Sequence, residues 1–228
     1  MATLWEGRLS GATTDALKAL NDSLQIDKRL YREDISGSTA HVKMLVSVGL
    51  IDESDGELIL DALKTIEEEM TSGSFVFQPE DEDIHTAVER RVTEIAGEAG
   101  ARMHTGRSRN DQVVTDLRLW TLKNLDELAT LVVSLQESLI EQAEKAEAAR
   151  LPGYTHLQQA QPVLLSHHLL AHAWALSRDF DRIMETRSRT DVSPLGAGAL
   201  AGSSLPIDPL MTSEFLGFSE TFKNLKNL

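Results

Sequence analysis

Apolar side chains recur at helical spacing along most of this sequence, and the longest such stretch begins at residue 111. From there to about residue 148 the pattern contains neither glycine nor proline. At ~1.5 Å per residue, this segment predicts a helix on the order of 55 Å long. Such a helix is rarely stable alone, because most helical stability comes from packing an apolar face, so we expect a bundle that subunits can share. The predicted apolar face carries Val114, Leu117, Leu128, Leu131, Leu135 and Leu139.

Shorter amphipathic segments precede and follow this stretch. The spacing predicts helices near residues 13–24, 28–48, 54–72 and 84–96, with a capping box at Ser54–Glu57 and a break at Gly37. Pro162 fits the first position of a second long helix that ends near Arg189. We expect the two long helices to pack antiparallel, with the Tyr154–His156 turn at one end.

The strand content is expected to be close to zero. Only Phe75–Pro79 has a β-like composition, and no internal repeat or low-complexity linker is present. The pattern therefore predicts an all-α fold. We divide it into a small helical N-terminal domain over residues 1–110 and an incomplete start of a central helical bundle over residues 111–228.

The segment that leads into the longest helix has the features of an anion site. Asn110 or Asp111 can serve as the N-cap, and Arg107 and Arg109 place two positive charges just before the helix. Gly106 lets the backbone approach a ligand closely. Free N–H groups and the helix dipole at this end favour a bound carboxylate or phosphate. The alternative interpretation is a capped helix with solvated arginines.

Composition narrows the function classes. The formal net charge is −14, and neither basic runs nor interleaved aromatic residues occur, which argues against nucleic acid and anionic membranes as partners. The absence of cysteine excludes disulfides and thiolate chemistry. No signal pattern and no apolar run long enough to span a bilayer is found, so a cytoplasmic location is the default expectation, or an organelle if an import segment was removed.

His156 is the histidine best suited to acid–base chemistry, because it lies in a polar, flexible turn where an imidazole can exchange protons near neutral pH. Ser23 reads most simply as a turn hydroxyl. His168 and His172 share a helix face, but Leu169 stands where a zinc-protease motif has its glutamate. No metal site is expected there, and no nucleotide-binding motif occurs.

The region from Asp191 to Pro206 is small, apolar and rich in glycine. Two interpretations stand equal for it: a tight backbone path beside a ligand, or a buried and closely packed connection.

Several phrases taken together resemble the argininosuccinate lyase family of the aspartase/fumarase superfamily, over residues 4 to about 220. They are His104–Gln112, Pro152–Gln158, Ala160–Pro162, Ser193–Gly202, Leu4–Trp5, Asp27–Arg32 and Glu82–His85. The resemblance implies helical homotetramers that split argininosuccinate into arginine and fumarate without cofactor or metal. It also implies active sites that combine residues of three subunits.

The same resemblance assigns roles to residues. Ser23, Asn110 and Thr155 match substrate-binding positions of the family, and His156 matches its acid/base histidine. To these we add Arg109 as a carboxylate partner, on the argument from the helix start. His85 is a weaker candidate for supporting the site.

Two departures from the family pattern bear on activity. Gln159 stands where many members have a basic residue. The family's Ser-Ser-x-Met-Pro-x-Lys-Lys-Asn loop, which carries the catalytic serine, does not occur in the sequence. We therefore expect this chain to be incomplete for activity by itself.

Two other functions remain as alternatives. A non-catalytic, truncated homologue that acts as a structural or assembly partner would have the same sequence features. Adenylosuccinate lyase or fumarase activity is disfavoured by the Gly106–Asp111 phrase.

Overall fold

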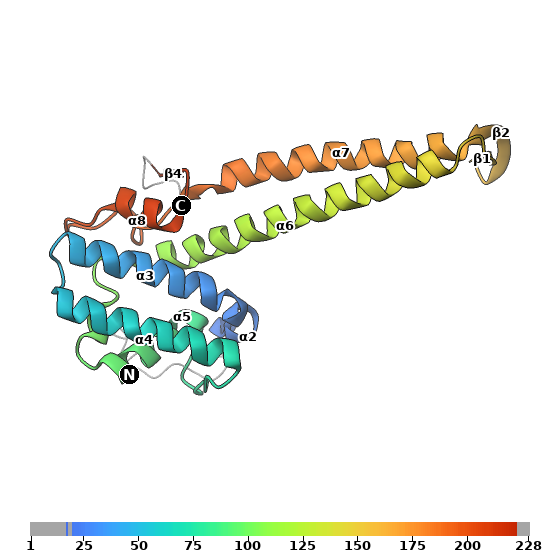
Figure 1. Cartoon of the computed structure of the whole chain (residues 1–228). Coiled ribbons are helices and arrows are strands. Elements are labelled where there is room, and N and C mark those ends of the chain that lie inside the picture. Colours follow the sequence, from blue (N-terminus) through green and yellow to red (C-terminus); the bar gives the residue numbers. More distant parts are fainter. Residues whose placement is uncertain (1–16, 18–19, 223–228) are drawn as a thin grey trace. The chain divides into compact units, whose positions relative to one another are not determined.

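The computed structural model describes residue 17 and residues 20–222, which form two compact units (Figure 1). One unit combines residues 1–117 with residues 193–228, and the other contains residues 118–192. The domain boundary at residue 110 remains our proposal from the sequence. The compact units are defined differently, by packing within one copy of the chain. Half of the helix predicted near residues 13–24, namely residues 13–16, 18 and 19, lies outside the described residues.

The first unit is built from helices α3, Tyr31–Ser47, α4, Glu53–Ser72, and α5, Ile84–Ala96. Short helices precede α3, namely α2, Leu24–Asp27, and the 3-10 turn η2, Lys28–Leu30; η3, Gly100–Arg102, follows α5. This unit also contains the start of α6, Arg109–Lys145, and the whole of α8, Pro209–Leu216. Two short strands complete it: β4, Glu220–Thr221, and β3, Val192–Ser193, of which Ser193 lies in this unit.

The apolar faces of α3, α4 and α5 meet in the core of this unit. Val42 and Leu45 of α3 are fully buried there, beside residues of the other two helices. α3 runs through Gly37 without the expected break, and α4 begins at Glu53 after Asp52, so the predicted capping box at 54–57 is wrong. The other members with no exposed surface are Ile59, Ala62, Ile66, Ile84, Val88 and Val92.

The second unit is a long antiparallel helical hairpin, made by the rest of α6 and by α7, Leu165–Thr190 (Figure 1). Gln136 donates a hydrogen bond to the Ala173 carbonyl at 3.1 Å, which ties the middle of one helix to the other. At the end opposite the connecting turn, Arg118 donates to the Thr190 carbonyl at 2.9 Å and so caps α7. The predicted antiparallel packing of the two long helices is confirmed.

A β-hairpin connects these helices, so the expectation of almost no strand and of a helix starting at Pro162 is wrong. β1, Arg150–Thr155, pairs antiparallel with β2, Gln158–Leu164, and Pro152 lies opposite Pro162. A two-stranded hairpin has only edge strands, which tolerate the missing N–H of proline. The proline therefore does not have to begin a helix.

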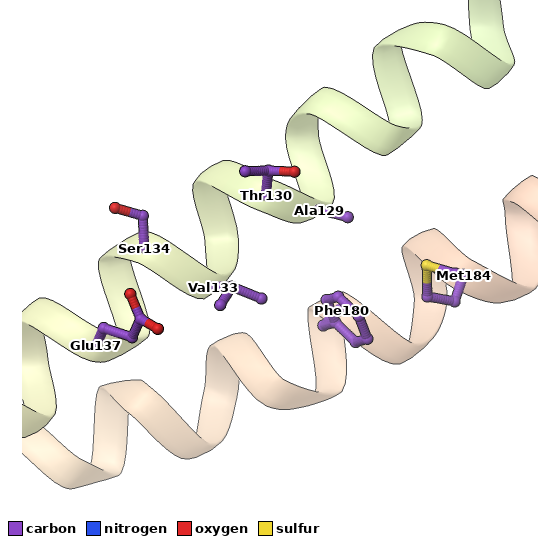
Figure 2. A pocket seen from close by; sticks show the side chains of 7 residues that line it. All are labelled: Ala129, Thr130, Val133, Ser134, Glu137, Phe180 and Met184. Carbon is purple, nitrogen blue, oxygen red and sulfur yellow. The ribbon is translucent and has the colours of Figure 1, made fainter.

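The two helices of this unit leave apolar surface open between and beside them. A groove of about 340 Å³ lies between α6 and α7, and Met184 is among its lining residues. Figure 2 shows Val133 of α6 facing Phe180 of α7 in this groove. Leu131 keeps 61% of its surface exposed. Two helices cannot enclose a core by themselves, so this unit exposes the predicted apolar face instead of burying it. In the described part of the chain, no helix is both long and apolar enough to cross a membrane.

Gly56 is expected to be required for the close packing of α4 against α3. A Cβ at this position would lie 2.4 Å from Cγ2 of Val46. Alanine stabilises a helix by about 1 kcal/mol relative to glycine. We nevertheless expect the free energy of unfolding of the G56A variant to fall by about 1–3 kcal/mol, because the added methyl group overpacks the contact between the helices. Urea unfolding measures the change, and the double variant G56A/V46A should recover most of it. A stabilised G56A variant would contradict this packing.

Candidate active site

The turn before α6 is closed by a reciprocal capping box. Ser108 precedes the helix, and its hydroxyl accepts a hydrogen bond from the Asn110 backbone N–H at 3.3 Å. The Asp111 carboxylate in turn accepts from the Ser108 N–H at 2.9 Å. The prediction of Asn110 or Asp111 as the N-cap was therefore wrong, because Asp111 acts from within the first turn. Asn110 is left exposed at the start of the helix.

Asp111 also fixes the glycine-rich segment that follows β3. Its second carboxylate oxygen accepts hydrogen bonds from the backbone N–H groups of Gly196, at 3.0 Å, and Gly198, at 2.9 Å. Both glycines have a positive φ, of 104° and 63°, which side chains rarely permit. Asp111 is fully buried. At these two glycines the interpretation as a closely packed connection is correct, because the Asp111 carboxylate already accepts the backbone hydrogen bonds that a ligand would need.

A buried ion cluster lies beside this turn. Nδ1 of His85 on α5 is 2.8 Å from a carboxylate oxygen of Asp34 on α3 and 3.2 Å from one of Asp116 on α6. The Gln112 amide also donates to Asp34. All four side chains are buried. The sequence suggested His85 only as a residue that supports the site and did not connect it with either aspartate.

The charges of this cluster explain its pKa values. Burial lowers the pKa of His85, but Asp34 and Asp116 oppose that effect and raise it to about 10. Burial raises the pKa of Asp34, while the charge of His85 and then that of Arg107 bring it well below its ordinary value. Burial and the charge of Asp34 raise the pKa of Asp116. The cluster therefore holds an imidazolium at neutral pH.

We tested whether Asp34, His85 and Asp116 could hold a metal ion instead. In the described part of the chain they are the one set of three such ligands that lie close enough together. The two carboxylates already face the His85 imidazolium and the buried guanidinium of Arg107. A divalent cation would add positive charge to these buried cations, so the residues fit a hydrogen-bonded ion cluster better than a metal site.

The two arginines of the turn differ from the expected solvated or ligand-binding pair. Arg107 is buried and donates to the Ser38 hydroxyl at 3.0 Å. Arg109 has 21% of its side chain exposed and donates to the Gln112 amide oxygen at 2.8 Å. It also lies 3.5 Å from Asp83 and 3.4 Å from Glu89. Protein carboxylates thus already surround the Arg109 guanidinium.

Ser23 lies in the same neighbourhood as Arg109. Its hydroxyl donates to Asp27 at 2.6 Å, and its backbone N–H donates to the carbonyl of Glu82 at 3.0 Å. Asp83, the next residue, is the one that contacts Arg109. Ser23 therefore contacts the residue that precedes a partner of Arg109, while Asn110, the next residue after Arg109, has its printed side-chain contact with Ser108 at 3.4 Å.

Thr155 and His156 belong to the other unit, at the tip of its β-hairpin. Thr155 pairs with Gln158 across a two-residue turn made by His156 and Leu157. Both turn residues have a positive φ, of 50° and 60°, as a type I′ turn requires. Left-handed backbone costs about 1–2 kcal/mol at a residue other than glycine, and the structure retains it at the candidate acid/base residue.

The rings of His168 and His172 pack edge to face on α7, with their centroids 5.0 Å apart.

Sequence reasoning missed Asp34, Gln112 and Asp116, although a signal was present. Along the first two turns of α6, Asp111, Gln112, Thr115 and Asp116 share one face, and this polar face is the buried one. Leu117, on the predicted apolar face, keeps 51% of its surface exposed. Polar residues at helical spacing beside an apolar stripe usually mark the solvent-facing side of a helix, so this signal by itself does not identify a buried site.

Comparisons with known proteins are consistent along nearly the whole chain. A family model described as Lyase matches residues 7–226. The argininosuccinate lyase of Symbiobacterium thermophilum is 48% identical over 224 residues, which cover 98% of this chain and 49% of the relative. That of Cutibacterium acnes is 49% identical over 222 residues, or 97% of this chain and 47% of the relative.

The chain therefore spans about half the length of the curated relatives it matches. Among solved structures, EDDS lyase in complex with formate is similar with a TM-score of 0.77 and 28% identity. The match covers 95% of this chain and 43% of that one. The expected helical fold of the aspartase/fumarase type is thereby confirmed.

Replacing Asp111 is expected to destabilise the turn and the glycine segment together. In the D111A variant, the backbone N–H groups of Ser108, Gly196 and Gly198 lose the carboxylate that accepts their hydrogen bonds. We therefore expect the free energy of unfolding, measured in urea, to fall by about 3–5 kcal/mol. The exposed Asp61 on α4 supplies the control D61A, which should change stability by less than about 0.5 kcal/mol. Equal losses in both variants would count against the proposed clamp.

His85 is expected to remain protonated well above neutral pH. Its pKa is raised from the ordinary 6.5 to about 10, so its contribution to stability is fully present below 6.5 and declines as the pH rises toward 10. NMR of the imidazole nitrogens should show the imidazolium at pH 8.5. The D34N variant should move the titration to lower pH, because the largest attractive charge is removed. A titration at or below pH 6.5 in the unsubstituted chain would disprove the ion cluster.

Proposed function

Since this chain belongs to the lyase family, we propose that it contributes to an argininosuccinate lyase, which eliminates fumarate from argininosuccinate to give arginine. The observation that supports this best is the similarity of nearly the whole chain to argininosuccinate lyases of different bacteria. The presence of Ser23, Arg109 and Asn110 on one unit and of Thr155 and His156 at the tip of the other adds support from the fold.

The reaction requires groups that this chain can supply in part. A base removes a proton from the carbon next to the carbon–nitrogen bond, donors stabilise the resulting dianion, and the bond then breaks as the leaving nitrogen takes up a proton. We assign proton transfer to His156, and carboxylate binding to Ser23, Asn110 and Thr155. Neither a metal nor a cofactor is part of the proposal.

The role proposed for Arg109 follows from its contacts. Asp83, Glu89 and Gln112 surround the guanidinium, so a substrate carboxylate would have to compete with them. We therefore propose that Arg109 orients the neighbouring Asn110, and that a direct contact with substrate is its second role.

The length of the second unit supports sites shared between copies of the chain. From Arg118 to Lys145, 28 residues of α6 extend over about 42 Å, and the β-hairpin follows at that far end (Figure 1). Asn110 precedes Arg118 by eight residues, which span at most ~28 Å. Asn110 lies in the first turn of α6 and His156 follows its last turn, so we propose that the two residues of one copy serve different sites.

We accordingly propose a homotetramer in the cytoplasm, in which His156 of one copy serves Asn110 of another. The exposed apolar face of α6 and α7 supports this assembly, because a bundle would cover it.

A complementation experiment tests the proposed function. The partner is the Symbiobacterium thermophilum enzyme with alanine in place of the histidine aligned with His156, which we expect to be inactive. After co-refolding with this chain, mixed oligomers should release fumarate from argininosuccinate, measured by ultraviolet absorbance, because each chain supplies what the other lacks. This chain alone should release none.

The matched control is the H156A variant of this chain, which should form the same mixed oligomers without restoring activity. Mixed oligomers that remain inactive with the unsubstituted chain would support the structural or assembly role instead. If native mass spectrometry detects no mixed oligomer, the assembly role is also excluded.

A further inference from the structure

The tip of the β-hairpin combines two unfavourable features at one residue. Leu157 exposes 96% of its surface, although its side chain is apolar. Its φ of 60° lies in the left-handed region, where two-residue hairpin turns prefer asparagine followed by glycine. Neither feature stabilises the hairpin, because the strand pairing from Arg150↔Leu164 to Thr155↔Gln158 needs no apolar side chain at the tip.

We infer that Leu157 is a positioning residue, whose side chain packs against a second copy of this chain beside the Asn110 turn and so fixes the imidazole of His156. This inference rests on the proposed function. His156 and Leu157 form the same two-residue turn, so any contact that holds one side chain also fixes the backbone of the other. An acid/base group must be held close to its reacting atom, and an unsupported tip does not provide this.

A second copy is the occupant that the observations favour. Within one copy, the tip follows the last turn of α6, whereas Asn110 lies in its first turn. The proposed function requires His156 beside an Asn110 turn. The tip itself offers an apolar anchor flanked by exposed Thr155 and Gln158, which is the pattern of a small buried contact with a polar rim.

The test uses the complementation assay with L157N and L157M variants of this chain. Asparagine adopts the left-handed region readily, so L157N should raise the melting temperature of the isolated chain by roughly 2 °C. In mixed oligomers, the same variant should lower kcat at least tenfold with little change in KM, because the imidazole loses its support. The L157M variant keeps an apolar side chain and should retain most of the activity.

The matched control is E147G. Glu147 is exposed, also has a positive φ, of 44°, and lies in the same unit. Glycine there should raise the melting temperature similarly without changing kcat. A higher melting temperature together with a lower kcat in L157N, and a higher melting temperature with unchanged kcat in E147G, would support the inference. Loss of a purely structural residue would lower the melting temperature and kcat together.

Three results would overturn it. They are an unchanged kcat in L157N, a loss of kcat together with a lower melting temperature, and a loss of kcat equal in L157N and E147G. If the unsubstituted chain restores no activity, the proposed function fails first, and this inference fails with it. If the unsubstituted chain is active and L157N is equally active, only the role of Leu157 is wrong.

Discussion

The Asp111 carboxylate is the interaction on which the candidate site depends. One oxygen closes the turn before α6 through Ser108, and the other holds the backbone N–H groups of Gly196 and Gly198. Gly196 and Gly198 lie 85 and 87 positions after Asp111 in the sequence, yet their N–H groups share this buried carboxylate with that of Ser108. Charged acceptors make strong hydrogen bonds in a dry interior, and removing one leaves several donors unpaired. Asn110 is therefore held on a rigid support although it is itself exposed.

The buried cluster of Asp34, His85 and Asp116 extends this support to α3 and α5. Each of the three helices contributes one ionisable side chain, and the His85 imidazolium lies between the carboxyl groups of Asp34 and Asp116. Burial raises the pKa of Asp116 to about 8, so this carboxyl group is mostly protonated at neutral pH. Such a cluster contributes less to stability than apolar packing of the same volume, because each ion must be desolvated. Its effect is to fix the register of the helices, since a small shift would leave a charge unpaired. Gly37 permits the close approach of Asp116, as a Cβ there would lie 3.1 Å from its carboxylate.

The sequence predicted the long helices well and the polar contacts poorly, for one physical reason. Periodicity reports where apolar side chains gather, which placed α6 and α7 and their antiparallel packing correctly. It does not report what covers them, so Leu117 lies on the predicted apolar face but keeps 51% of its surface exposed, whereas Asp116 is fully buried. Pro162 misled because its preference for a helix start competes with its tolerance in edge strands. Asp111 and Asp34 bind groups far away in sequence, which no local pattern contains.

The two candidate parts of the site differ in how they are held. Ser23, Arg109 and Asn110 lie on a unit with an apolar core and a buried ion cluster, so their geometry is determined within one copy. His156 lies on a hairpin at the end of two helices that enclose no core, and its backbone adopts a left-handed conformation without glycine. An imidazole on so weakly supported a tip gains a defined position only where other surfaces pack against it. The same helices expose the apolar faces that would make such packing favourable, so the proposed assembly and the proposed positioning of the imidazole have one physical origin.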